Sequence, residues 1–319
     1  MLRSICTLLF IFSSTVAISQ TPSSQPSKSN IPKNDTAKGS NITASTSRVL
    51  NKLRAGEPLV IAYREASIPF SYVAGGADPI GYAIDLCVHL AGVMQRELKL
   101  KELPIQYLPV TSAQRIPTIV EGKADLQCSS TTNNAERRQQ VAFTIPHFIT
   151  GGRYLVKSDS KIKGIDDLRG KKVVSTVGTT VIKQIEQKNQ ELSLGITVLQ
   201  GANHTQGVEM VENGEADAFV MDDILLYGLA VSRPDPKALK IVGKHLNTEP
   251  LAIMFGKDDP ELKKLIDKEM RRLILSKEIY PIYDKWFTKP IPPKNYNLNL
   301  PPSFLLRDFW KYPSDFVPN

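Results

Sequence analysis

The chain has 319 residues, a formal net charge of +8 and a sequence pI of about 9.2. Its content of 41% hydrophobic and 23% charged residues is typical of a soluble globular protein of about two domains. The basic residues are spread along the chain without a basic stripe or a nucleic-acid motif, so we expect no nucleic-acid partner. The histidines and cysteines lie at no ligand spacing, so we expect neither a metal site nor a cofactor.

The first 46 residues do not have the pattern of a folded domain. Residues 1–19 resemble a cleavable secretory signal, with Arg3 near the start, a short apolar run and small residues at Ala17-Ile-Ser19. The apolar run is shorter than the roughly 20 residues of a membrane-spanning helix. Residues 20–46 are rich in Ser, Thr, Pro, Asn and Lys, which predicts a disordered spacer. We therefore expect an exported, soluble protein.

From residue 47 onward, short apolar runs alternate with amphipathic stretches. The runs predict strands at 59–63, 105–110, 125–128, 141–144, 153–157, 172–176, 196–200, 218–221, 239–242 and 251–255. The amphipathic stretches predict helices at 84–98, 111–121, 164–169, 178–192, 205–213, 223–231 and 260–276. Pro281 is expected to interrupt the segment that follows. This order predicts an α/β fold with mostly parallel sheets.

The predicted mature chain keeps two cysteines, Cys87 and Cys128. An oxidising compartment permits a disulfide between them. However, Cys87 lies on the apolar face of a predicted helix and Cys128 at the end of a predicted strand. Two buried thiols explain these positions equally well, and the sequence leaves both alternatives open.

Three arginines, Arg64, Arg115 and Arg137, follow predicted strands, each close to a serine or threonine. A guanidinium holds a carboxylate through two parallel hydrogen bonds, and nearby hydroxyl groups add donors. A single arginine on a loop is ordinarily a solvated charge, so the prediction of an anion site rests on the context that all three share. Gly178-Thr-Thr180, at the start of a predicted helix, is either a plain turn or a further set of backbone donors.

The segments Glu121–Cys128 and Asn213–Val220 resemble each other. Each contains a glycine and then Ala-Asp leading into an apolar strand, after which the chain presents Ser130 and Thr132 in one case and Asp222 in the other. A generic helix-to-strand turn is one explanation. The other is a pair of similar lobes whose loops face a shared cleft. Asp222 could equally cap the helix that follows it.

Seven segments carry a family resemblance: Arg64–Tyr72, Thr111–Pro117, Cys128–Arg137, Val177–Thr180, Val220–Asp223, Ile241–Lys244 and Lys285–Asn295. In this order and spacing they resemble the periplasmic glutamate/aspartate-binding proteins of ABC importers, from about residue 48 to 311. The resemblance implies the periplasmic binding protein-like type II fold, with two Rossmann-like lobes joined by a two-strand hinge. Lobe 1 would comprise residues 47–150 and 247–319, and lobe 2 residues 151–246.

The resemblance also implies which residues bind the α-carboxylate and the α-ammonium group of an amino acid. Arg137 matches the arginine that takes the α-carboxylate, supported by Thr132 and Ser130. Asp222 matches the acid that pairs with the α-ammonium group.

The remaining matched residues imply recognition of an acidic side chain. Arg64, Arg115 and Ser112 match the groups that hold the side-chain carboxylate, while Thr180 and His204 match contacts from the second lobe. The choice between glutamate, aspartate and their amides stays open, because one methylene changes binding by only about 1–3 kcal/mol.

The predicted function is therefore that of a monomeric periplasmic protein that captures an acidic amino acid and delivers it to an inner-membrane ABC permease. The alternative is a periplasmic enzyme on the same fold, such as a dehydratase, which needs an acid or base beside its substrate. His204 and Glu65 are the candidates, and the sequence suggests no orienting partner for either. A third alternative, the sensor module of a receptor, requires a membrane span or a fused signalling domain, and the sequence predicts neither.

Overall fold

A computed structural model describes residues 46–316. The predicted signal peptide and all but the last residue of the predicted spacer lie outside the described residues. The described part opens with helix α1 (Arg48–Arg54), which begins where the side chain of Ser47 accepts a hydrogen bond from the backbone N–H of Leu50.

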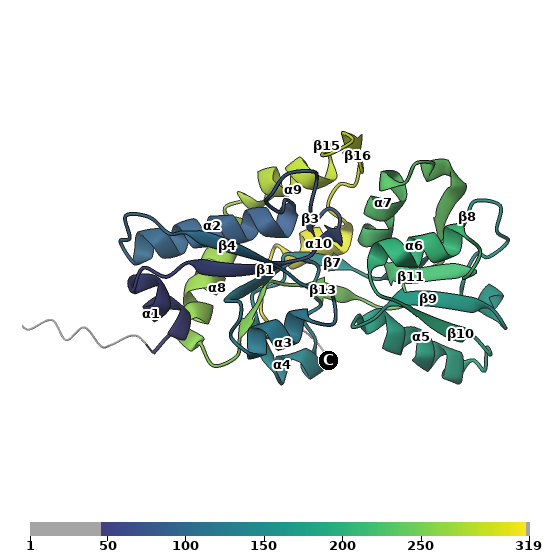
Figure 1. The fold of residues 1–319 in the computed structure, drawn as a ribbon, viewed down its shortest axis with the longest axis horizontal. Helices are drawn as coiled ribbons and strands as arrows, with labels where there is room; N and C mark the ends of the chain where they lie inside the picture. The colour runs from purple at the N-terminus through teal and green to yellow at the C-terminus, as the bar shows by residue number, and fades with distance from the viewer. Residues whose placement is uncertain (1–45, 317–319) are drawn as a thin grey trace, which may run out of the picture. The chain divides into compact units, whose positions relative to one another are not determined.

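The first of two five-stranded sheets contains four parallel strands and one antiparallel strand, and Figure 1 labels its strands β1 (Leu59–Tyr63) and β4 (Ile105–Pro109). In spatial order its strands are β4 (Ile105–Pro109), β1 (Leu59–Tyr63), β5 (Leu126–Cys128), β14 (Met254–Gly256) and β6 (Val141–Phe143). Strand β14 runs antiparallel to both of its neighbours. Four of the five strands therefore come from one continuous stretch, and the fifth returns from more than a hundred residues later.

The second sheet repeats this plan. Its order is β10 (Thr197–Gly201), β9 (Lys172–Thr176), β11 (Ala218–Asp222), β8 (Gly152–Lys157) and β12 (Leu239–Val242). Here β8 is the antiparallel strand. The structure thus confirms the prediction of an α/β fold with mostly parallel sheets.

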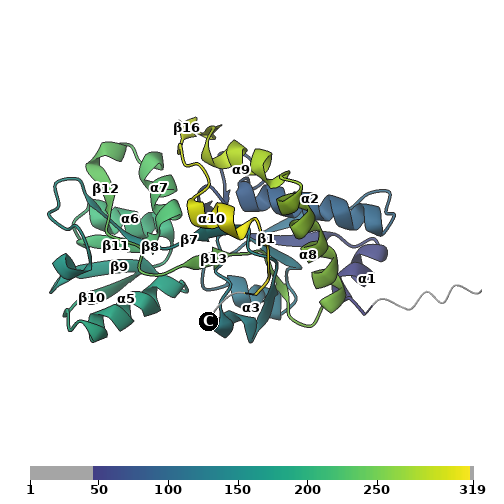
Figure 2. The same ribbon diagram turned by 180° about the vertical axis from the view of Figure 1, so that it is seen from behind.

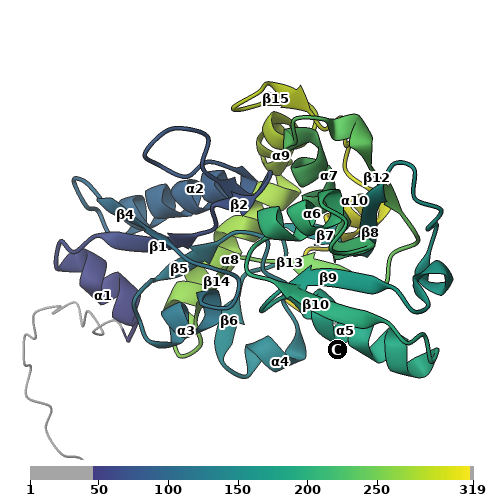
Figure 3. The same ribbon diagram turned by 45° about the vertical axis from the view of Figure 1, so that its right-hand side comes forward.

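Helices cover both faces of each sheet, which explains why the strands are buried and apolar. Helix α2 (Tyr82–Glu97) packs on β1 and β5, and α3 (Arg115–Val120) packs on β5 and β14. In Figure 3, α5 (Thr180–Glu191) lies on one side of β9 and β10, and α6 (His204–Glu212) on the other. The remaining helices are α4 (Ala135–Arg138), α7 (Asp223–Ser232), α8 (Pro260–Leu275), α9 (Ile279–Phe287) and α10 (Phe304–Phe309), with short 3-10 turns at Ile165–Leu168 and Pro236–Ala238.

Two antiparallel strands, β7 (Phe148–Thr150) and β13 (Glu249–Leu251), carry the chain between the two sheets, as Figure 2 shows. The sequence predicts a single strand over 251–255, and this is wrong. The chain leaves the β7 pair after Leu251 and joins the first sheet only at Met254, because the two pairings lie in different sheets. Two further short pairs, β2 (Ala66–Ser67) with β3 (Ser71–Tyr72) and β15 (Pro290–Ile291) with β16 (Tyr296–Asn297), complete the strands.

Two of the differences between predicted and observed helices have a clear local cause. Pro281 does not interrupt a helix but lies in the first turn of α9, where the missing N–H has no helical acceptor to lose. The helix predicted over 111–121 begins at Arg115, because Thr111 and Gln114 close the preceding turn through reciprocal side-chain hydrogen bonds of 3.0 and 3.2 Å. Arg115 therefore stands at the first position of α3.

An aromatic cluster packs the C-terminal region against the crossing strands. Phe148 of β7 stacks on Phe287 of α9 with 5.0 Å between ring centroids. Trp310, just after α10, meets Tyr283 edge-on at 5.8 Å. Buried aromatic side chains thereby pack the C-terminal segment against the start of β7.

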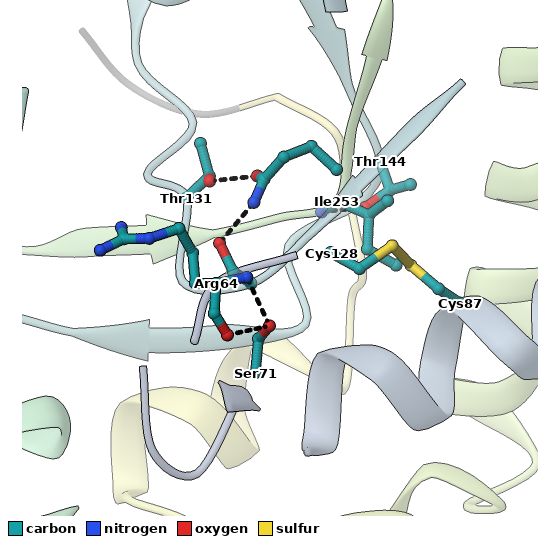
Figure 4. The surroundings of a disulfide bond; sticks show 9 residues. Arg64, Ser71, Cys87, Cys128, Thr131, Thr144 and Ile253 are labelled. Atoms are coloured by element: carbon teal, nitrogen blue, oxygen red, sulfur yellow. Dashed lines mark hydrogen bonds between the residues drawn. A yellow bond between two sulfur atoms is a disulfide. The ribbon is translucent and has the colours of Figure 1, made fainter. Parts of the chain in front are cut away.

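Cys87 of α2 and Cys128 at the end of β5 form a disulfide, which settles the alternative that the sequence left open (Figure 4). Both cysteines are fully buried. The bond attaches α2 to the strand from which the Ser130 and Thr132 loop departs, so it fixes the start of that loop.

Replacing both cysteines by alanine is expected to lower the free energy of unfolding by about 3–4 kcal/mol, because the bond closes a loop with a sequence separation of 41 residues. Urea denaturation of oxidised protein measures the difference. As a control, wild type and variant are compared with a reductant present in the denaturant, where most of the difference should disappear. An equal difference under both conditions would assign the effect to side-chain packing.

Candidate functional site

The predicted site residues lie where parallel strands of both sheets end, the edge at which open α/β sheets bind ligands. Arg64 follows β1, Ser112 and Arg115 follow β4, Ser130 and Thr132 follow β5, Thr180 follows β9, His204 follows β10, and Asp222 ends β11. Arg137 comes from α4, further along the loop that leaves β5.

Seven of the nine predicted residues line one cavity of about 10 Å³: Ser112, Arg115, Ser130, Thr132, Thr180, His204 and Asp222. This is room for about one water molecule. The other two are attached to its walls: Arg64 donates a hydrogen bond to Ser112, and Arg137 donates to the backbone carbonyl of Thr132. The tertiary structure therefore brings all nine together, and a solute larger than water requires the walls to move apart.

The three arginines are buried, with 2%, 3% and 6% of Arg64, Arg115 and Arg137 exposed. Burial lowers the pKa of Arg115, and the charges of Arg137 and Arg64 lower it further, against the opposing effect of two carboxylates. Burial likewise lowers the pKa of Arg64 to about 10. Three guanidinium groups thus share one poorly hydrated region, which is unfavourable unless anionic or strongly polar acceptors are near.

Arg115 and Arg137 meet at one acceptor. The Nη1 atom of Arg115 donates to the Ser130 carbonyl and the Thr131 hydroxyl at 3.3 and 3.1 Å, and its Nη2 donates to the Gly178 carbonyl at 3.3 Å. Arg137 donates to the Thr132 carbonyl at 3.0 Å and to the same Gly178 oxygen at 3.3 Å. A single backbone oxygen from the second sheet's loops therefore accepts from two arginines of the first sheet's loops.

Gly178 allows the loops of the two sheets to approach closely. A Cβ atom at this position would lie 2.7 Å from both the Cα and the backbone nitrogen of Ala113. The backbone also has φ near +78°, which favours glycine. The motif Gly178-Thr-Thr180 is thus a contact point between loops of the two sheets, in addition to the start of α5.

Asp222 ends β11 and precedes α7, but its side chain makes no capping hydrogen bond, so the helix-cap alternative is wrong. Its Oδ1 atom is buried and has no hydrogen-bond partner among the described residues. Burial raises the pKa of Asp222 well above its usual value, Glu249 and Asp223 raise it further, and Arg115 and Arg137 oppose the rise. An incoming cation would relieve this unfavourable position of the carboxylate.

His204 is a buried, neutral imidazole. Its Nδ1 atom lies 2.8 Å from the Thr176 hydroxyl, and its Nε2 atom has no partner among residues 46–316. Burial lowers its pKa well below the usual value, and Arg64 and Arg115 lower it further. Its orienting partner is a hydroxyl and not a carboxylate, and Glu65, the other candidate acid or base, is exposed and does not line the cavity.

Sequence reasoning missed Glu249, a buried carboxylate in β13. Its charge acts on Arg115, Arg137 and Asp222 alike. One signal was available, since Glu249 is an acid at the edge of the otherwise apolar run Pro250–Phe255. Nothing in that pattern indicates which side chains it faces.

Within the described residues, no cluster of three or more His, Cys, Asp or Glu side chains is arranged to hold a metal ion. No helix between residues 46 and 316 is both long and apolar enough to cross a membrane. The site offers cationic donors, hydroxyl groups and unpartnered acceptors around one cavity, which are the means of recognising a small zwitterionic or anionic solute.

Two α/β sheets joined by paired crossing strands define the class of type II periplasmic binding proteins. The structure resembles an ancestral arginine-binding protein bound to arginine, at 27% identity and a TM-score of 0.65, over 72% of this chain and 98% of that one. Residues 59–289 match the model for bacterial extracellular solute-binding proteins, family 3, and the chain belongs to this family.

Two relatives match most of the chain. The L-glutamate/L-aspartate-binding protein of Pseudomonas aeruginosa is 40% identical over 83% of this chain and 88% of its own length. The glutamate/aspartate import solute-binding protein of Salmonella typhimurium is 37% identical over the same shares. The resemblance inferred from the seven segments is thereby confirmed.

The variant Asp222→Asn is expected to stabilise the ligand-free protein at pH 7–8 by about 1 kcal/mol or more, because a neutral amide replaces a poorly paired buried carboxylate. The folded-state pKa of Asp222 is raised, so wild-type stability falls as the pH rises from the unfolded pKa towards the folded pKa, because only the unfolded state loses its proton in that range. Below the unfolded value near 4 both side chains are neutral and the gain should disappear. Thermal unfolding across this pH range measures the effect.

Asp159→Asn, at an exposed position, is the matched control and should show no such pH-dependent gain. A loss of stability in Asp222→Asn at neutral pH would mean that attraction to the arginines outweighs burial.

Proposed function

We propose that this protein captures L-glutamate or L-aspartate between its two lobes and delivers it to an ABC permease. The observation that carries the proposal is that Arg115 and Arg137 are buried and both donate to the neutral carbonyl of Gly178. A carboxylate carries a negative charge and can accept two parallel hydrogen bonds from a guanidinium group, which a neutral carbonyl oxygen cannot. A ligand carboxylate is therefore a better partner than the carbonyl for either arginine.

The recognition scheme assigns one charged partner to each end of the ligand. Arg137, with Thr132 and Ser130, binds the α-carboxylate, and Asp222 binds the α-ammonium group. The buried, unpartnered Oδ1 of Asp222 supports this assignment, since an ammonium group would supply the missing donor.

The side-chain carboxylate is assigned to Arg64, Arg115 and Ser112, with Thr180 and His204 as contacts from the second lobe. The hydrogen bond from Arg64 to Ser112 supports this grouping, because it attaches Arg64 to a residue that lines the cavity. The names of the two relatives support an acidic ligand.

The same proposal places the mature protein in the periplasm as a monomer, after removal of residues 1–19. The lobes are residues 47–150 with 247–319, and 151–246. Ligand binding closes them, and the closed form signals to the permease that the carrier is loaded.

A dehydratase-like enzyme on the same fold is the competing candidate. His204 would be its acid or base, but the hydroxyl of Thr176 is the group that orients its ring. Incubating the protein with each amino acid and recovering the ligand chemically unchanged separates the binding protein from the enzyme.

The variant Arg137→Ala should abolish binding of glutamate, aspartate and their amides alike, because all carry the α-carboxylate. Removing one partner of a buried charged pair costs about 3–5 kcal/mol of binding free energy. The dissociation constant should therefore rise by roughly a hundredfold or more. Calorimetric titration of refolded, ligand-free protein measures this.

Arg138→Ala is the matched control, since Arg138 lies on the same short helix and donates to the side chain of Asn133, whereas Arg137 donates to the carbonyl of Thr132 in the cavity lining. It should bind almost as wild type does. Arg137→Lys should not restore affinity, because an ammonium group lacks the planar fork. Affinity of Arg137→Ala within about tenfold of wild type would contradict the assignment.

Ligand binding is expected to reduce the radius of gyration in small-angle scattering. Gly178→Ala should reduce this change and weaken binding by about tenfold or more, because the added Cβ meets the backbone of Ala113 and the backbone conformation disfavours a side chain. Gly164→Ala is the control, since a Cβ there has no atom within 4 Å. Confirmed binding with an unchanged radius in wild type would show that the lobes do not close on the ligand.

A further inference from the structure

Glu249 is a buried carboxylate to which the recognition scheme assigns no role. It begins β13, one of the two crossing strands, and only 1% of its surface is exposed. Its Oε1 atom accepts hydrogen bonds from the side-chain amides of Gln184 on α5 and Asn247. Its Oε2 atom is buried and has no partner among the described residues. One half of this carboxylate is therefore satisfied, and the other half is not.

Glu249 lies beside the ligand cavity. It lines a larger neighbouring cavity of about 720 Å³, and this cavity shares Thr132 and Thr180 with the smaller one. The other charged groups on its lining, Glu136 and Lys183, pair with each other at 2.6 Å and are exposed. The charges of Glu136 and Lys183 are exposed to water and neutralise each other. Glu249 is therefore the buried charged residue in the lining of this larger cavity.

The charge of Glu249 acts on three groups of the site. It opposes the lowering of the pKa of Arg115 and of Arg137, and it raises the pKa of Asp222. These groups stand on α3, α4 and β11, so Glu249 acts on side chains from both sheets. In a poorly hydrated site such interactions are several times stronger than in water.

When Asp222 and Glu249 are both ionised, as they would be with an ammonium group paired to Asp222, the charges of the site add up to one positive unit. Arg64, Arg115 and Arg137 are opposed by Asp222 and Glu249, and His204 is neutral. An acidic amino acid with its ammonium and both carboxylates ionised carries one negative charge. Its complex is therefore neutral, whereas the complex with an amide retains the positive charge. Without Glu249 the site would hold two excess positive charges, and the complex with the acid would keep one.

We propose that Glu249 is a specificity-determining residue that limits the positive charge of the site to the single unit that a monoanionic amino acid neutralises. The inference deepens the proposed function and rests on it for the identity of the ligand. Glu249 acts through charge on the groups that hold the ligand, while Gln184 and Asn247 keep its carboxylate in place. It thereby sets the margin by which the acid is preferred over its amide.

The test is calorimetric titration of wild type and Glu249→Gln with glutamate and glutamine over a range of pH. Removing the negative charge should favour the anionic ligand over the neutral one, so the ratio of the glutamine to the glutamate dissociation constant should rise about tenfold. Glu249→Asp, which keeps the charge, should retain the wild-type ratio. Gln184→Met removes a hydrogen bond to Glu249 without changing charge, and should weaken both ligands equally.

The pH profile supplies a second measurement. Asp222 is faced by Glu249 from β13, Asp223 from α7, Arg115 from α3 and Arg137 from α4. Glutamate affinity should rise with pH as Asp222 ionises, and Glu249→Gln should move this rise to lower pH. The proposal would be overturned if Glu249→Gln changed neither the ratio of the two dissociation constants nor the pH profile of glutamate affinity, because Glu249 would then have only a structural role in the crossing strands. A fall in that ratio would also overturn it.

A third measurement needs no ligand and separates failure of this inference from failure of the proposed function. Repulsion between the two carboxylates predicts that Asp222→Asn stabilises the ligand-free protein less in the Glu249→Gln background than in wild type. Urea unfolding at pH 8 gives the four stabilities of this double-mutant cycle. Additive effects would overturn the charge coupling even where glutamate binds. Absence of glutamate and aspartate binding by wild type, with the coupling present, would overturn the proposed function and the assigned ligand alone.

Discussion

Three buried guanidinium groups within one small region are the constraint on which the rest of the structure depends. Arginine stays charged at neutral pH even where burial lowers its pKa, so like charges cannot be removed by deprotonation. The protein offsets them with carbonyl acceptors at strand ends, hydroxyl groups and two carboxylates. The offset is incomplete, and this incompleteness gives an anionic ligand its advantage.

The backbone of the fold places the three arginines and the carboxylates close together, so their positions do not depend on attraction between opposite charges. Arg64 and Asp222 lie at strand ends. Arg115 begins α3, just after a turn that the side chains of Thr111 and Gln114 close by hydrogen bonds. Arg137 lies on a short helix that Asn134 caps. The disulfide fixes the end of β5 behind them. Most of the stabilisation comes from helices packed on both faces of two sheets, so the site can retain unfavourable charges.

The atoms that bring the loops of the two sheets into contact include the arginine groups that are assigned to the ligand. The Gly178 carbonyl contacts two arginines, and the absence of a side chain at Gly178 lets the loops of the two sheets approach. The crossing strands contribute Glu249, whose charge acts on the same arginines. Under the proposed function, an arriving carboxylate competes with a backbone oxygen, and the binding energy is the difference between the two partners.

The sequence by itself determined the order of most strands and helices, and strands such as Lys172–Thr176 and Leu239–Val242 begin and end where the apolar pattern does. It did not predict the short helices Arg48–Arg54, Ala135–Arg138 and Phe304–Phe309. It also indicated the family, because the residue types and spacing of segments such as Cys128–Arg137 can be recognised without knowing the fold. Tertiary structure alone decided the Cys87–Cys128 bond, the separation of β13 from β14, and the position of Glu249 beside the arginines. The physical reason is range: periodicity and capping reflect neighbours within a few residues, whereas these three features depend on which distant segments cross.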